Sequence, residues 1–469
     1  MGGRSARLPT VLVGLVVVLV ALVLYLASNP YRDNLYNHFV WQAEAYLRGE
    51  VAIEYPAPST ATEPGNWYFL DVYPISPTRA LVPFPPLPAL VLLPFVAAFG
   101  RAVDQEAIAI GVSALAVGAA WWMLGRLSVR IAVRLLATVF FALGTVFWWT
   151  ASVGSTWYFA HSVALVPALL AVGVAIRGDP RAVADPSDDD PEDAHDGPLP
   201  EPRPPRRLVL SLDGRQLAAG FLLGMAATAR LPMIFGAPFL VLVGSGGTWS
   251  RRAISAGVGA AIPVLALLAY NVATTGHAFH PGYEYQYQLE ATGYPTLGYH
   301  PDWAIEDLRY VPQNLAIMLG SLPVLLPESL PDSLRPGAVP LCVETSVRGL
   351  FDPACPLAVP RDIGTSLLLS SPAYLLVLGT LRGWGRSRLV TGALLAIGAI
   401  ALLDLMHFSQ GWVQWGYRFS NDFVPFALPL VALGATAAHG RVRSVAVVLV
   451  VASVLVNAWG VAWGNLLGW

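Results

Sequence analysis

Long apolar runs alternate with short polar segments along most of the chain. The first run, 9–28, covers about twenty residues, enough for an α-helix to cross a bilayer core about 30 Å thick. It ends in Asn29-Pro30 rather than in a small-residue cleavage site, which favours an uncleaved helix over a signal peptide. Further runs predict membrane helices over 104–124, 135–151, 158–176, 215–231, 233–247, 253–272, 364–381, 389–407, 422–438 and 444–463.

The run 81–99 is apolar but contains five prolines. Proline disrupts the helical hydrogen bonds that lipid requires, so we expect this run to lie at the outer interface. If 81–99 is not counted as a membrane span, 18 of the 28 arginines fall on the same side of the membrane as the N-terminus. The positive-inside rule then makes this side the cytoplasmic one. The fold class predicted is therefore an all-α polytopic membrane protein with about eleven transmembrane helices and a cytoplasmic N-terminus.

The runs also divide the chain into five parts. The acidic and proline-rich linker has too few apolar residues for a core, so we expect it to be disordered in the cytoplasm. The outer region after it is rich in Pro, Tyr and His, and a helix is expected near 312–326. The parts are 1–176 with a first outer loop at 29–103, the linker 177–214, membrane helices in 215–272, the outer region 273–363, and membrane helices in 364–469.

Composition supports this reading. Hydrophobic residues make up 55% of the 469 residues and charged residues 12%, about half the share of a soluble domain, and the mean hydropathy is +0.57. These values exclude an ordinary soluble enzyme, a disordered chain and a basic-patch nucleic-acid binder. All 28 basic residues are arginines, so no lysine is present to act as a base, a Schiff-base former or a P-loop phosphate ligand.

Both cysteines, Cys342 and Cys355, lie in the second outer region. A disulfide is permitted outside the cytoplasm, and closing so short a loop stabilises the chain by about 3 kcal/mol. A metal site is the alternative, but no further ligands are evident nearby. We therefore favour the disulfide.

The first outer loop carries polar residues close to the membrane. Apolar residues at 35, 39, 43, 46 and 47 predict one face of an interfacial helix, with Asn34 as its N-cap and Gly49 at its end. Asp33 stands between the first membrane helix and this one, where it is either a capping acid or a catalytic acid. Asp71 follows in an aromatic cluster, Trp67 to Pro74.

Arginines at the outer ends of membrane helices call for anionic partners. Arg230 ends the fifth span, and Arg418 lies between the last two spans. The simple structural interpretation of Arg418 is an i,i+4 pair with Asp422, whereas the functional one is a bidentate clamp for a phosphate. His161, one turn inside the fourth span, is either a packing residue or part of a site.

These residues resemble the GT-C superfamily of polytopic glycosyltransferases, nearest the aminoarabinose-transferase and protein O-mannosyltransferase type. In that family an acid follows the first membrane helix, and a helix with an Ala…Leu-x-Gly pattern comes next. Pro-Pro-Leu and Phe-Gly elements follow later in the chain. An Ala-Arg-Leu-Pro stretch and a Tyr-Arg-Phe…Pro-Phe element complete the pattern. The matching residues are Asp33, Ala43, Ala45, Leu47, Gly49, Pro85, Pro86, Leu87, Phe99, Gly100, Ala226 to Pro232, Tyr417, Arg418, Phe419, Pro425 and Phe426.

The resemblance implies an enzyme of the cell membrane whose active site faces outward. It would move a sugar from a polyprenyl-phosphate donor to a glycan, lipid or protein acceptor, with inversion, and it would contact membrane lipid but no nucleic acid. Asp33 is the expected base, and Arg418, Arg230 and Arg101 are expected to hold the donor phosphate. No cofactor is required, no metal ligand is assigned, and a need for a divalent metal stays open. We expect the substrate cavity to be lined by Asp71, His38, Tyr158, His161, Gln414 and Tyr417.

Two other functions remain possible from the residues alone. A transporter or flippase for a lipid-linked sugar would place charged residues near mid-membrane and show internal repeats, and no clear repeat is evident. A non-catalytic scaffold of the cell envelope would tolerate alanine at Asp33 and Arg418.

Overall fold

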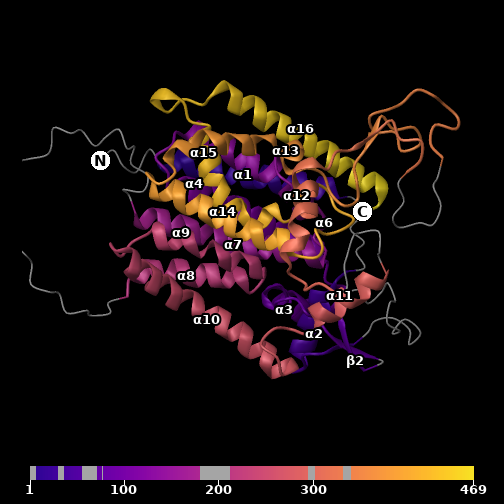
Figure 1. Cartoon of the computed structure of the whole chain (residues 1–469), viewed down its shortest axis with the longest axis horizontal. Helices are drawn as coiled ribbons and strands as arrows, with labels where there is room; N and C mark the ends of the chain where they lie inside the picture. The colour runs from indigo at the N-terminus through magenta and orange to yellow at the C-terminus, as the bar shows by residue number, and fades with distance from the viewer. Residues whose placement is uncertain are drawn as a thin grey trace, which may run out of the picture.

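The computed structural model describes residues 7–29, 36–54, 71–76, 78–179, 212–293, 302–330 and 340–469. This part of the chain is mostly helical and carries two small antiparallel sheets (Figure 1). Its α-helices are α1 (Arg7–Ser28), α2 (His38–Leu47), α3 (Leu87–Phe99), α4 (Gln105–Leu124), α5 (Ile131–Leu143), α6 (Phe147–Val153), α7 (Thr156–Gly178), α8 (Gly214–Ala227), α9 (Ala237–Leu242), α10 (Trp249–Thr275), α11 (Gly282–Gly293), α12 (Val311–Gly320), α13 (Leu367–Ser370), α14 (Arg388–Met406), α15 (Ser420–Gly434) and α16 (Ser444–Leu467). The 3-10 helices are η3 (Gly100–Ala102), η7 (Leu231–Gly236), η9 (Leu308–Tyr310), η10 (Pro372–Gly383) and η11 (Ala438–Gly440).

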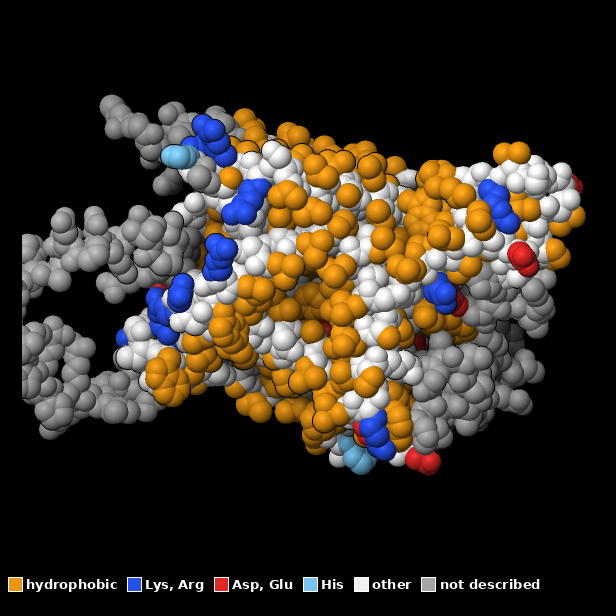
Figure 2. Space-filling model, turned by 45° about the horizontal axis from the view of Figure 1, so that its top comes forward, with side chains coloured by type: hydrophobic (Ala, Val, Ile, Leu, Met, Phe, Trp, Pro, Cys, Tyr) orange, Lys and Arg blue, Asp and Glu red, His pale blue; other side chains and the backbone are white. Residues whose placement is uncertain are grey.

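Six of the described helices are long and apolar enough to cross a membrane, namely α1, α4, α7, α10, α14 and α16. The pair α5 and α6 makes a seventh if the 51° bend between them is counted within one span. Large apolar side chains face outward on these helices, such as Leu19 on α1 and Leu455 on α16, which are 58% and 64% exposed. Figure 2 shows the same apolar surface over the middle of the molecule. Because so much apolar surface is costly in water, the long helices indicate a membrane protein.

The expected eleven spans are not confirmed as eleven continuous helices. All eleven runs contain helix, but five of them hold short or broken helices, because prolines and glycines interrupt the apolar pattern. Gly144 ends α5, and Pro232 stands in the first turn of η7. The run 422–438 is the 15-residue helix α15, which contains Pro425 and Pro429. Apolarity alone therefore overstated the number of long helices.

The proline-rich run 81–99 begins in strand β3 (Arg79–Leu81) and continues as α3. The prolines beside the start of α3 fit there, because the first N–H groups of a helix have no intrahelical partner anyway. With 13 residues, α3 is about 20 Å long at 1.5 Å per residue, which is too short to cross a bilayer core about 30 Å thick.

Helices α8 and α10 cross at glycines. A side chain at Gly220 would put its Cβ 2.0 Å from the carbonyl oxygen of Ala256, and one at Gly259 would clash in the same way with Leu217. Small residues allow this close approach of two backbones, as in helix pairs within membranes. The crossing fixes α8, which leads directly to Arg230.

Arginines gather at one end of the molecule, where Figure 2 shows a row of them. At this end α7 finishes and α14 begins, and Arg388 contacts Asp179 at 2.7 Å between Nη2 and Oδ1. Arg252 of α10 lies within electrostatic range of both residues. The beginning of α7 and the end of α14 therefore lie at the opposite end of the bundle, away from this arginine-rich end.

The predicted helix of the first outer loop is α2. It ends near Gly49, as expected, and its N-cap is Asn37; the predicted cap Asn34 lies outside the described residues. Phe39 and Ala43 are buried as predicted, whereas Leu47 is 49% exposed, so the last position of the predicted apolar face was wrong. After α2 comes a three-stranded sheet that the sequence did not reveal, with β1 (Ile53–Glu54), β3 and β2 (Tyr73–Ser76) in the order β1-β3-β2.

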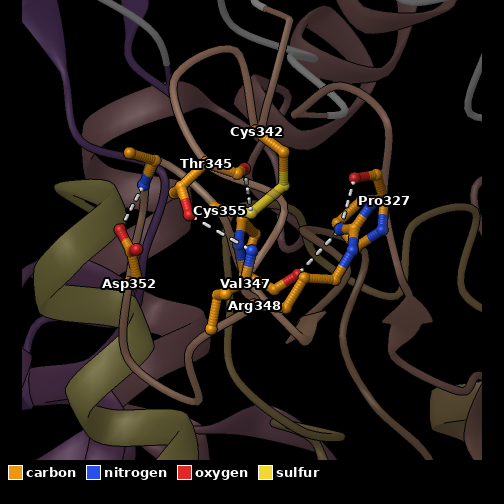
Figure 3. The surroundings of a disulfide bond; sticks show 9 residues. Pro327, Cys342, Thr345, Val347, Arg348, Asp352 and Cys355 are labelled. Atoms are coloured by element: carbon orange, nitrogen blue, oxygen red, sulfur yellow. Dashed lines mark hydrogen bonds between the residues drawn. A yellow bond between two sulfur atoms is a disulfide. The ribbon is translucent and has the colours of Figure 1, made fainter.

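The second outer region contains α11, η9, α12 and the two-stranded sheet of β4 (Val324–Leu325) and β5 (Ala358–Val359). The expected helix at 312–326 is α12, which ends at Gly320. The disulfide Cys342–Cys355 is confirmed (Figure 3). Beside it, Arg348 donates hydrogen bonds of 2.9 Å to the carbonyl oxygens of Pro327 and Pro356. The expected cytoplasmic linker lies almost wholly outside the described residues.

Candidate active site

Arg230 and Asp422 form a buried ion pair where the end of α8 meets the beginning of α15. Arg230 Nε donates to Asp422 Oδ1 at 3.1 Å, and Nη2 donates to Oδ2 at 2.5 Å, so the pairing is bidentate. His161 Nδ1 lies 3.1 Å from the same carboxylate, and the side chains of His161 and Asp422 are fully buried. Asp422 thus pairs with Arg230 and not with Arg418, and the i,i+4 interpretation of Arg418 is wrong.

Polar groups without partners surround this ion pair. Asp404, at the end of α14, and Tyr417 lie within electrostatic range of Asp422, and both are buried. Buried polar atoms are normally hydrogen-bonded, so several orphaned atoms in one place suit water or a polar ligand. Among the described residues of this site, those without a hydrogen-bond partner are Asp404 Oδ2, His161 Nε2, Gln410 Oε1, Gln414 Oε1, Tyr417 OH and Arg418 Nε.

Arg418 is held by aromatic rings and not by an acid. Its Cζ lies 5.3 Å from the ring centroid of Tyr158 and 5.4 Å from that of Phe419. Arg230 Cζ lies 5.3 Å from the same Phe419 ring. In the described part of the chain no carboxylate oxygen lies within 4.0 Å of the Arg418 guanidinium nitrogens. Arg418 therefore has a charge that an anionic ligand can neutralise.

Gly411 leaves room for the Arg418 guanidinium. It has a φ of +86°, and a Cβ at this position would lie 2.7 Å from Arg418 Nη2 and 2.6 Å from Gln414 Oε1. Gln414 itself is fixed, because its Nε2 donates to the carbonyl oxygens of Gln410 at 2.7 Å and Ile363 at 3.1 Å. The loop before α15 is thus shaped around the guanidinium.

Asp71 brings a carboxylate to the same site. It precedes β2, where the buried Val72 anchors the small sheet, and its own φ is +70°, a conformation that few residues other than glycine adopt. The Trp157 indole at the start of α7 and the Arg418 guanidinium both lie close enough to Asp71 to act on its carboxyl. Burial raises the pKa of the Asp71 carboxyl to about 6, although the Trp157 indole and the charge of Arg418 each lower it.

Two further side chains complete the surroundings. Tyr283 on α11 lies within electrostatic range of both Arg230 and Asp71, and burial raises its pKa to about 12. His38 is buried at the start of α2, and its Nδ1 lies 3.0 Å from Thr156 Oγ1 at the start of α7. The helices α2, α7 and α11 therefore meet around the Asp71 side of the site.

Most of the described residues expected in the site lie together, but Arg101 does not join them. Arg101 pairs instead with Glu44 at 2.5 Å and Glu54 at 3.5 Å, and its side chain is 36% exposed. The expected base Asp33 lies outside the described residues. In the described residues no three His, Cys, Asp or Glu side chains are grouped as a metal site would require.

Sequence reasoning missed Asp422 and Asp404 as members of the site. Both lie at helix ends, where an acid commonly caps or is solvated, so their positions alone gave no warning. The signal that could have found Asp422 is Arg230, since an arginine at a helix junction without room for water requires a buried anion. Tyr283 gave no such signal, because its outer region is rich in tyrosine throughout.

The fold and the site together define a helical membrane protein with a buried polar centre at one end of its bundle. That centre contains an ion pair, an arginine without a carboxylate partner among the described residues, and a nearby buried acid. Comparisons of the chain with protein-family models, curated proteins and solved structures found no match.

Proposed function

We propose that the protein is a membrane glycosyltransferase of the GT-C type that uses a polyprenyl-phosphate-linked sugar. The observation that carries the proposal is the Arg418 guanidinium, half-buried beside two aromatic rings without a carboxylate partner in the described residues. A planar guanidinium binds a phosphate through two parallel hydrogen bonds. Asp71 nearby provides the carboxylate that a sugar transfer requires.

The distribution of charge supports an outward-facing site. The arginine-rich end of the bundle is the cytoplasmic end under the positive-inside rule, and the N-terminal arginines belong to the same side. The start of α7 and the end of α14, which bear Tyr158, His161 and Asp404, lie at the other end. The site then faces the outside of the plasma membrane, where lipid-linked sugars meet glycan, lipid or protein acceptors.

The chemistry is a single displacement. The acceptor hydroxyl attacks the anomeric carbon, the bond from that carbon to the phosphate oxygen breaks, and a first-loop carboxylate takes the hydroxyl proton. The resemblance assigns this proton to Asp33. The leaving phosphate is already an anion, so it requires cations and no general acid, and one displacement inverts the anomeric centre.

Arg418 and Arg230 differ in what they offer the phosphate. Because Asp422 neutralises Arg230, we assign most of the phosphate binding to Arg418. Arg230 contacts the Phe419 ring and has a structural role. Arg101 has its own carboxylates and contributes least. The donor phosphate is therefore assigned to Arg418 first.

The test is sugar transfer by the purified full-length chain in lipid nanodiscs. Radiolabelled polyprenyl-phosphoryl sugars are supplied one at a time with an envelope extract as acceptor. We expect label from one of them to leave the lipid and become covalently attached to acceptor, and we expect Arg418→Gln to reduce the rate at least 100-fold. If no donor loses its sugar to any acceptor, the proposal fails.

A flippase for a lipid-linked sugar is the second candidate, favoured by the charged pair Arg230–Asp422, whose carboxylate is fully buried. Liposomes separate the two. A flippase moves the labelled donor between leaflets without changing it, whereas the transferase produces a covalent product.

A further inference from the structure

We propose that Asp71 is the carboxylate that accepts the proton of the attacking hydroxyl, and that it works as a pair with Arg418. The inference rests on the proposed function, because it names the proton acceptor of that reaction. It departs from the resemblance, which points to Asp33.

The first argument is the space between the two groups. Asp71 and Arg418 lie within electrostatic range of each other, yet their oxygen and nitrogen atoms are more than 4.0 Å apart and form no ion pair. A proton acceptor and a phosphate ligand have to be separated in this way, because the hydroxyl and the anomeric carbon stand between them in the reaction.

The second argument is how the pair is held. The consecutive residues Trp157 and Tyr158 at the start of α7 contact one partner each. The Trp157 indole lies close enough to Asp71 to lower the pKa of its carboxyl, and the Tyr158 ring faces the Arg418 guanidinium. One turn of a rigid helix thus sets the spacing of the two groups.

The third argument is the environment of Asp71. It is only 8% exposed, and its φ of +70° is a backbone conformation that residues other than glycine rarely adopt. Such strain persists where surrounding structure imposes it, commonly at functional sites. Among the described residues, the charged and titratable groups within electrostatic range of Asp71 are Arg418 from the loop before α15, Tyr283 from α11 and Tyr36 from the segment before α2.

The reaction balances with these groups. The acceptor oxygen forms a bond to the anomeric carbon, and the bond from that carbon to the phosphate oxygen breaks with its electron pair going to the phosphate. The hydroxyl proton moves to the Asp71 carboxylate, and Arg418 neutralises the released phosphate. The proton leaves Asp71 to solvent before the next cycle.

Ionisation of Asp71 should have opposite effects on donor binding and on turnover. Above pH 6 the ionised Asp71 carboxylate attracts Arg418 and weakens donor binding, yet only the ionised form accepts a proton. Polyprenyl-phosphoryl mannose is a suitable probe, because a phosphodiester keeps its single charge between pH 5 and pH 8. We expect wild-type protein to bind it at least fivefold more tightly at pH 5 than at pH 8.

Asp71→Asn tests both halves. It should bind the probe equally at both pH values, and with the proposed sugar donor it should transfer at least 100-fold more slowly at saturating donor. Trp157→Phe keeps an aromatic ring but removes the indole N–H, which lowers the pKa of Asp71, so it should move the midpoint of the wild-type profile to higher pH. Asp307→Asn is the control, because Asp307 pairs with Arg309 on the surface and should leave both profiles unchanged.

Two outcomes overturn the inference. One is sugar transfer by Asp71→Asn within threefold of the wild-type rate. In that case Asp33 becomes the proton acceptor again, and the proposed function is unaffected. The other is an unchanged pH dependence of probe binding in both Asp71→Asn and Trp157→Phe. If wild-type protein itself transfers no sugar, the proposed function fails, and the binding profile alone then decides whether Asp71 and Arg418 interact.

Discussion

Arg230 and Arg418 both lie at the outer ends of predicted membrane helices, but their surroundings in the structure differ. Each was predicted as an outer-side arginine that topology alone does not explain. In the structure Arg230 is neutralised by a buried carboxylate, whereas Arg418 faces aromatic rings. The sequence could mark both residues but could not tell them apart, because the partner Asp422 lies 192 residues from Arg230. Contacts at such separations depend on helix packing.

Substitution of the two arginines should therefore have different effects. Arg230→Gln leaves the Asp422 carboxylate buried without a cation and should destabilise the protein by about 3–5 kcal/mol. Arg418→Gln breaks no ion pair and should keep the melting temperature while weakening binding of a polyprenyl-phosphoryl sugar at least tenfold. Thermal unfolding and donor binding in detergent measure both.

The double variant Arg230→Gln with Asp422→Asn is the matched control. It removes both charges and should recover much of the stability lost in Arg230→Gln. Equal destabilisation by Arg418→Gln and Arg230→Gln would contradict the distinction between the two residues.

At the scale of elements, apolar periodicity located helices well and their continuity poorly. For α4, α7, α14 and α16 the predicted ends lie within a few residues of the observed ends. The runs that became α8, α9 and η10 contain glycine, serine and proline, which break them into short pieces. The sheet around Asp71 was missed because its strands have only two to four residues, too few to show an alternating pattern.

The crossing of α8 and α10 gives a prediction about packing. Gly220→Val places side-chain atoms where the Ala256 carbonyl lies, so it should lower the melting temperature strongly and reduce folded yield. Gly257→Val lies on the same pair of helices but faces open space, and it should leave the melting temperature almost unchanged. A similar fall in melting temperature in both variants would show that valine destabilises these helices wherever it is placed, and not through the contact at the crossing.

The disulfide gives a second prediction. The pair Cys342→Ser and Cys355→Ser releases a constraint of about 3 kcal/mol on the intervening loop. Limited proteolysis should then cut between these positions much faster than in wild-type protein, while the melting temperature of the helical bundle changes little. Val343→Ala, an exposed substitution in the same loop, should leave the cleavage rate unchanged.

At the scale of the whole molecule, the separation of charge supports the proposed orientation in the membrane. The arginine count predicted one cytoplasmic side, and the structure gathers Arg252, Arg388 and the end of α7 at one end of the bundle. Arg230 and Arg418 of the candidate site lie at the other end. This arrangement could be predicted from the sequence because loop charge needs no knowledge of packing, unlike the contacts within the site.

Cysteine labelling tests this orientation. The two natural cysteines form the disulfide, so an added cysteine is the reactive one. In intact cells a membrane-impermeant maleimide should label Phe279→Cys, beyond the end of α10, and should not label His439→Cys, in η11 between α15 and α16. The reverse pattern would place the active site in the cytoplasm.

The most direct test of the central claim is the structure of the full-length protein in lipid nanodiscs with a bound polyprenyl-phosphoryl sugar, determined by electron cryo-microscopy. The account predicts the donor phosphate within hydrogen-bond distance of the Arg418 guanidinium, with the anomeric carbon between that phosphate and the Asp71 carboxylate. A donor bound with its phosphate away from Arg418, or with Asp71 facing away from the sugar, would contradict it.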